Sequence, residues 1–185
     1  MKKLMAIAIA IMVCAALPVG CGSKAPSNGG DSRTPDDIRG TVYDAGSVSV
    51  LIPEGWKALP VKNGFSDEEE VYPDRLNICK GGKEEVDLLD YPSIKLTYFA
   101  PDTDMLTPSP SLYDNVQELE PITIGERTWT GFSGTSLRKK LILLWTGESG
   151  ADQFQVALWI EAEMGTISLE DADVQAIIAS IRPSE

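Results

Sequence analysis

The chain has 185 residues, with 16 Lys and Arg against 28 Asp and Glu, for a net charge of −12, and it contains no histidine. So acidic a protein repels polyanions, which speaks against nucleic acid as a partner. The lack of histidine excludes Ser-His-Asp and Cys-His catalytic systems and every histidine-ligated metal site.

The N-terminus has the three-part plan of a secretory signal peptide. Lys2 and Lys3 precede an apolar run of roughly 14 residues, shorter than the ~20 residues that span a bilayer. The small residues Val19 and Gly20 before Cys21 resemble a bacterial lipoprotein signal, in which the cysteine is lipidated and becomes the new N-terminus. We therefore expect a signal peptide over 1–20 and a lipid on Cys21. The alternative is an ordinary signal peptide cleaved elsewhere, or a retained anchor.

Residues 21–40 are rich in Gly, Ser, Pro, Asn and Asp. This composition cannot bury enough apolar surface to fold, so it predicts a flexible tether. Strand-like patterns begin at about residue 41, and we expect one globular domain over 41–185. Cys79 is the one cysteine of that domain, which excludes an intramolecular disulfide and cysteine-rich zinc sites.

Alternating apolar residues predict strands over 48–52, 56–61, 75–79 and 91–100. The last is the clearest, because Ile94, Leu96 and Tyr98 face one way. Lys95, Thr97 and Phe99 face the other way.

The next segment contains one expected helix and four expected strands. Ser111, with Asp114 three residues later, indicates a short helix over 111–118. A Gly125-Glu126-Arg127 turn predicts a hairpin over 122–132, and a glycine-containing turn joins the strands expected over 140–146 and 154–162.

The chain closes with a predicted helix. Ser168 followed by Asp171 suggests a capping box at its start. Val174, Ile177, Ile178 and Ile181 then repeat at i, i+3, i+4 and i+7, which is one apolar helix face, before Arg182-Pro183 ends it.

These elements predict an α+β fold, a mostly antiparallel β-sheet with packed helices, closed by the C-terminal helix. Their order resembles the Mog/PsbP-like fold family, which includes many bacterial lipoproteins of unassigned function. The resemblance rests on Ile52-Pro53-Glu54-Gly55-Trp56, Asn77-Ile78-Cys79-Lys80-Gly81, the strand from Pro92 to Tyr98, and Ile177-Ile178-Ala179-Ser180-Ile181. It implies an α/β/α sandwich and an accessory or assembly role. It transfers no catalytic residue, because the family shares no catalytic motif.

Two features are candidates for binding a partner. Arg138, Lys139 and Lys140 form the one basic cluster of an acidic chain, and can receive an acidic partner or a headgroup phosphate. A solvated loop is the alternative. Trp145 is the other candidate, provided that it faces solvent rather than lying in the core. It then belongs to an aromatic patch that can serve as a platform for sugars, which we expect to draw on Trp56, Trp129, Trp159, Tyr98 and Phe132.

Weaker candidates concern metals and thiol chemistry. Asp102 and Asp104 form a D-x-D pair, and 67–70 is an acidic run, but neither has the spacing of a calcium loop. Solvated acidic loops are the simpler interpretation, so we predict no cofactor. Cys79 follows Ile78 in an apolar strand, which favours a buried, unreactive thiol.

We therefore expect a lipoprotein on the extracytoplasmic face of the cell membrane, anchored through its N-terminal lipid. Its domain is expected to act without catalysis, as a binding or assembly module for an envelope protein partner. The alternatives are a surface lipoprotein that binds a ligand or divalent metal through its acidic loops, and an atypical enzyme that uses paired carboxylates.

Overall fold

The computed structural model describes residues 33–64 and 70–185. The expected signal peptide, Cys21 and the acidic residues 67–69 lie outside the described residues. Among the described residues, no helix has the length and apolar character needed to cross a bilayer.

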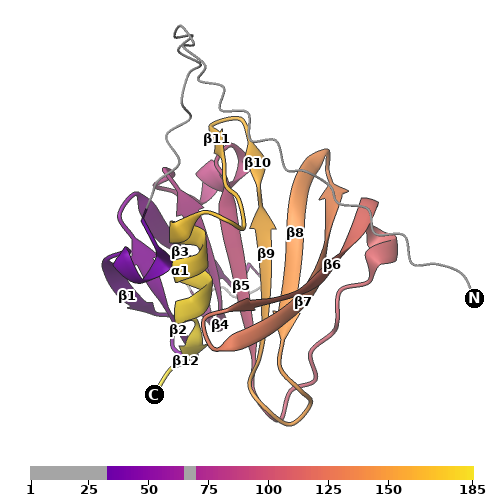
Figure 1. The fold of residues 1–185 in the computed structure, drawn as a ribbon. Helices are drawn as coiled ribbons and strands as arrows, with labels where there is room; N and C mark the ends of the chain where they lie inside the picture. Colours follow the sequence, from indigo (N-terminus) through magenta and orange to yellow (C-terminus); the bar gives the residue numbers. More distant parts are fainter. Residues whose placement is uncertain (1–32, 65–69) are drawn as a thin grey trace, which may run out of the picture. The chain divides into compact units, whose positions relative to one another are not determined.

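A seven-stranded sheet, antiparallel at every pairing, forms the main body of this part of the chain (Figure 1). The strand order inserts β9 between β5 and β8, so the centre of the sheet joins segments far apart in sequence. Across the sheet the strands are β3 (Trp56–Lys62), β4 (Val71–Lys80), β5 (Ser93–Phe99), β9 (Gln153–Trp159), β8 (Lys139–Thr146), β7 (Arg127–Ser136) and β6 (Asp114–Ile124).

Smaller elements complete the fold. A three-stranded sheet joins β1 (Gly40–Asp44), β2 (Val48–Pro53) and β12 (Arg182–Pro183), and β10 (Glu161–Ala162) pairs with β11 (Gly165–Thr166). One α-helix, α1 (Ala172–Ser180), lies among the described residues, together with the 3₁₀ turns η1 (Pro35–Asp37), η2 (Glu85–Leu89) and η3 (Pro110–Leu112). The expected mostly antiparallel sheet with a helix near the C-terminus is confirmed.

The main core lies between α1, β2 and one face of the large sheet. The predicted helix stripe is correct, since Val174, Ile177 and Ile178 are fully buried and Ile181, just after the helix, is 1% exposed. They pack with Val48 and Val50 of β2 against the sheet. On the sheet side, the alternation predicted for β5 also holds, with Ile94, Leu96 and Tyr98 in this core.

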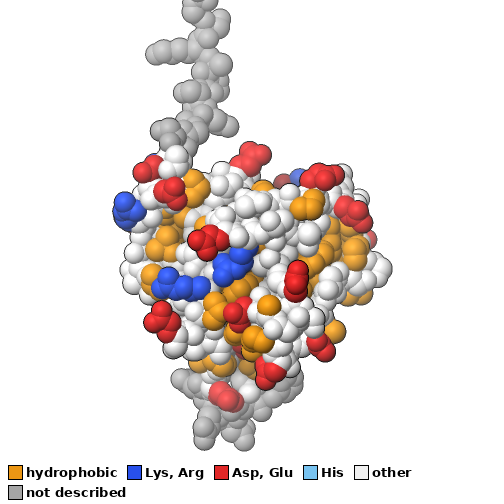
Figure 2. Space-filling model, turned by 60° about the horizontal axis from the view of Figure 1, so that its bottom comes forward, with side chains coloured by type: hydrophobic (Ala, Val, Ile, Leu, Met, Phe, Trp, Pro, Cys, Tyr) orange, Lys and Arg blue, Asp and Glu red, His pale blue; other side chains and the backbone are white. Residues whose placement is uncertain are grey.

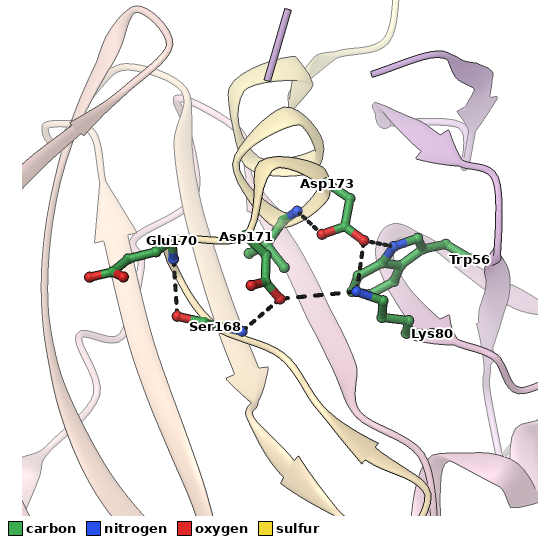
Figure 3. A network of polar contacts seen from close by, with 7 residues as sticks. Trp56, Lys80, Ser168, Glu170, Asp171 and Asp173 are labelled. Atoms are coloured by element: carbon green, nitrogen blue, oxygen red, sulfur yellow. Dashed lines mark hydrogen bonds and ion pairs between the residues drawn. The ribbon is translucent and has the colours of Figure 1, made fainter. Parts of the chain in front are cut away.

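Side chains from β3 and β4 hold the start of α1 (Figure 3). The Asp173 carboxylate accepts hydrogen bonds from the Trp56 indole N–H and the backbone N–H of Val174, at 2.8 and 2.9 Å, and pairs with the Lys80 ammonium at 2.8 Å. Burial raises the pKa of Asp173, but the Lys80 and Trp56 bonds together outweigh it and hold that pKa below its ordinary value. Trp56 and Lys80 belong to two segments that carry the Mog/PsbP resemblance.

The capping box predicted before the helix forms only in part, and it closes a turn that precedes the helix. The Ser168 backbone N–H donates to the Asp171 carboxylate at 3.0 Å, and the Glu170 backbone N–H donates to the Ser168 hydroxyl at 3.2 Å (Figure 3). The helix itself begins at Ala172, with Asp171 as its N-cap residue.

The helix predicted over 111–118 is wrong. The segment holds the short turn η3 and then β6, an 11-residue edge strand that pairs with β7. The register shifts between Asp114 and Gln117 and again between Leu119 and Ile122. The predicted hairpin around Gly125–Arg127 is confirmed, and it is longer than expected because β6 extends back to Asp114.

Candidate functional site

The face of the large sheet that points away from α1, which we name the open face, is built from alternate residues of its strands. Three rows of side chains cross β5, β9 and β8 on this face. The rows are Ser93, Trp159 and Leu141; Lys95, Ala157 and Leu143; and Thr97, Gln155 and Trp145. No α-helix of the described residues covers this face.

Two adjoining hollows on the open face share Trp159 as a wall, and we name them together the groove. The first, about 230 Å³, is lined by Lys95, Tyr113, Gln155, Trp159 and neighbouring residues of β5, β8 and β9. The second, about 220 Å³, is lined by Asn77, Leu88, Leu89, Ser93, Leu137 and Lys139 in addition to Trp159. The groove thus combines an aromatic floor, aliphatic side chains and two lysines.

The four tryptophans divide between the two faces of the sheet. Trp56 and Trp129 lie in the main core, 7% and 0% exposed. Trp145 and Trp159 are half-buried on the open face. Trp145 packs edge-on against Phe132, with ring centroids 6.1 Å apart, and lines a third hollow of about 300 Å³ beside Pro108 and Pro110. Trp145 therefore belongs to a partly exposed aromatic surface, outside the groove.

The predicted basic cluster is separated by the strand geometry. Leu137 and Arg138 form a tight turn between β7 and β8, and consecutive residues of β8 then point to opposite faces. Lys139 lines the groove and donates a hydrogen bond to the Leu89 carbonyl. Lys140 pairs with Glu161 at 2.6 Å instead, and Arg138 is exposed in the turn. Of the three, only Lys139 contributes to the groove.

The groove has a charge opposite to that of the chain as a whole. None of the described residues that line its two hollows is Asp or Glu. The side chain of Lys95 is exposed in the middle row and, among residues 33–64 and 70–185, makes no hydrogen bond or ion pair. On the face shown in Figure 2, acidic side chains are spread over the surface, with hydrophobic and basic side chains exposed between them.

Two exposed leucines stand at the rim of the groove. Leu137 is 88% exposed and Leu89 is 66% exposed, and both line its second hollow. Leu137 and Arg138 have φ angles of 51° and 64°. This left-handed conformation strains residues other than glycine, asparagine and aspartate. The turn therefore presents a leucine where turn chemistry favours Asn-Gly.

The metal candidates remain apart from the groove. Asp102 and Asp104 are exposed in the turn and loop after β5, and Asp102 accepts a 3.5 Å hydrogen bond from the Thr103 hydroxyl. Within the described ranges, no three Asp, Glu or Cys side chains gather closely enough to hold a metal.

Cys79 is fully buried, as predicted. Burial raises the pKa of its thiol, which the backbone N–H of Gly82 only partly offsets. Because the thiolate is the reactive form, the raised pKa disfavours chemistry at this cysteine.

Of the groove residues, Lys95 was not among the candidates from sequence, and Trp159 was considered only as part of an aromatic platform with Trp145. The signal for Lys95 was available: it is the one charged residue in a strand whose other residues are buried or half-buried. Trp159 could not be assigned to the groove without the pairing of β9 between β5 and β8.

A scan against protein-family models and a search of curated proteins found no match to this chain. Among solved structures, it is similar to a protein from Bacteroides thetaiotaomicron VPI-5482, whose crystal structure is at 1.50 Å resolution. The two are 13% identical with a TM-score of 0.42, over 80% of this chain and 50% of the other. The chain thus spans about half the length of that protein.

Proposed function

We propose that this protein is a lipid-anchored, extracytoplasmic binding module that holds an envelope protein partner in the groove on its open face. The observation that carries the proposal is the groove itself, where Trp159 and exposed leucines combine with two lysines and no carboxylate. Aromatic and aliphatic side chains surrounded by polar groups are the usual composition of protein interfaces.

The anchor is the second part of the proposal. The apolar run that ends at Val19-Gly20-Cys21 supports a lipid on Cys21, and the polar composition of the segment after it supports a tether. A diacylated cysteine supplies two chains, which suffice for stable membrane attachment. The tether would let the groove search for partners near the membrane at raised effective concentration.

Binding rather than catalysis is the proposed activity. The chain has no histidine, and the described lining of the groove has no carboxylate to act as a general acid or base. The accessory role implied by the Mog/PsbP resemblance agrees with this. That fold assignment is also part of the proposal, supported by α1 packed on one sheet face and attached to the Trp56 and Lys80 segments.

The test uses affinity capture of the tagged protein from cells after chemical crosslinking. The double variant Leu89→Asp with Leu137→Asp is compared with Val42→Asp, which changes a 52% exposed valine on β1. We expect the groove variant to lose at least tenfold of a specific partner by quantitative mass spectrometry, and the β1 variant to retain it.

A Cys21→Ser version tests the anchor in the same experiment. It should lose metabolic labelling with an alkyne-modified palmitate and leave the membrane fraction. Equal partner recovery from both aspartate variants would contradict the proposed binding face. Unchanged palmitate labelling of the Cys21→Ser chain would contradict the proposed anchor.

A further inference from the structure

The chain has a net charge of −12, yet Lys95 and Lys139 have no acidic partner within the part of the chain that the structure describes. Neither lies within 4.0 Å of a described carboxylate, whereas Lys80 and Lys140 both form ion pairs. A carboxylate brought by a ligand would complete a charge-assisted hydrogen bond with Lys95, the strongest common class of protein hydrogen bond. The local charge therefore favours a ligand with a carboxylate.

The position of Trp159 adds a spacing rule. Trp159 lies opposite Ser93, and Lys95 is two residues along the same strand on the same face. Lys95 and Trp159 are therefore diagonal neighbours, about 7 Å apart along the sheet. Residues i and i+2 of an extended peptide point to the same side and are also about 7 Å apart. An extended peptide can thus place one side chain against Lys95. The side chain two residues further along, which points to the same side, then lies against Trp159.

The remaining lining suits a peptide better than a compact ligand. Amide and hydroxyl groups of Asn77, Ser93 and Gln155 can bond to peptide N–H and C=O groups along the groove. Leu89 and Leu137 at the rim offer apolar contact beyond the Trp159 floor. The two hollows, of about 230 and 220 Å³, lie on either side of Trp159 and together give room for several residues of an extended peptide.

We propose that the groove binds an extended segment of the partner protein in which an Asp or Glu precedes or follows a bulky apolar residue at a spacing of two. The carboxylate meets Lys95, and the apolar side chain packs on Trp159. This inference deepens the proposed function and rests on it.

The test is an array of nine-residue peptides that carry Glu at position four and Leu, Phe or Trp at position six, together with peptides in which these two positions are exchanged. A paired array has Gln in place of Glu. The full chain in detergent is the probe, and fluorescence anisotropy gives the affinity of the tightest peptide. We expect at least tenfold weaker binding when Glu becomes Gln. The Lys95→Gln variant should lose the same factor, while Lys62→Gln, which changes an exposed lysine on β3, stays within twofold.

Three results would overturn the inference: no binding by any Glu peptide, equal binding of Glu and Gln peptides, or full affinity in a folded Lys95→Gln protein. Binding of the Cys21→Ser chain to phosphatidylglycerol vesicles in place of peptides would assign the lysines to a lipid surface and would also overturn it.

If the peptides fail while Leu89→Asp with Leu137→Asp still abolishes partner capture, the proposed function stands and only the peptide chemistry is wrong. If both fail, the proposed function fails with it.

Discussion

Asp173 meets hydrogen-bond donors from three parts of the chain: Trp56 in β3, Lys80 at the end of β4 and the backbone of α1 itself. Its side chain is 20% exposed, so water replaces these donors poorly. The contacts fix the start of α1 over the core. They also satisfy the indole N–H of a mostly buried tryptophan, which would otherwise cost free energy.

Replacing Asp173 with Asn should reduce the free energy of unfolding at neutral pH by about 1–2 kcal/mol, because Lys80 loses its nearer ionic partner and keeps only Asp171, at 4.0 Å. The loss stays in this range because the Lys80 side chain is itself 37% exposed. Urea denaturation measures this, with Glu170→Gln as an exposed neighbouring control.

The same residue makes stability depend on pH. The pKa of Asp173 is lower in the folded than in the unfolded chain, so the unfolded chain binds more protons as the pH falls below about 4. The contribution of Asp173 is thus complete above the unfolded pKa and disappears as pH falls through the folded one. Carboxylates take up protons between about pH 5 and pH 2. As the pH is lowered through this range, the melting temperature of Asp173→Asn should therefore fall less steeply than that of the native protein. Parallel curves would contradict this assignment.

At the scale of the elements, β6 shows why one sequence prediction failed. Two β-bulges shift its register, and each shift turns the following residues to the other face. The partly buried residues of β6, and Tyr113 just before it, therefore recur at every third position, at Tyr113, Val116, Leu119 and Ile122. The helix was predicted from Ser111 with Asp114 three residues later, and the spacing of three among the apolar residues gives no strand alternation to oppose it. Only pairing with β7 decides the outcome. The regular strand β5 has no such bulge, and its alternation was predicted correctly.

The turn between β7 and β8 gives a prediction that separates stability from binding. Replacing Leu137 and Arg138 with Asn and Gly should raise the free energy of unfolding by about 1–2 kcal/mol, because both positions have left-handed φ angles. Urea denaturation measures the gain. The same variant should capture less partner, since Leu137 leaves the rim of the groove. A more stable variant with unchanged capture would show that Leu137 has no part in binding.

At the scale of the whole folded domain, the sequence predicted the secondary-structure elements better than the order of the strands in the sheet. Residue periodicity predicted the helix stripe at Val174–Ile181 and most strands. It could not predict that β9 lies between β5 and β8, because that order depends on contacts between distant segments. The groove exists only through this order, since Trp159 comes from β9, Lys95 from β5 and Lys139 from β8. The basic cluster was identified, but strand alternation leaves one of its three residues in the groove.

The central claim is that the open face holds the partner. The most direct measurement places a photo-crosslinking amino acid at Leu137 in living cells, with Val42 on β1 as the matched exposed control position. We predict that Leu137 crosslinks one specific envelope protein, that Lys95→Gln reduces this product, and that Val42 does not form it. The same product from Val42, or none from Leu137, would contradict the account.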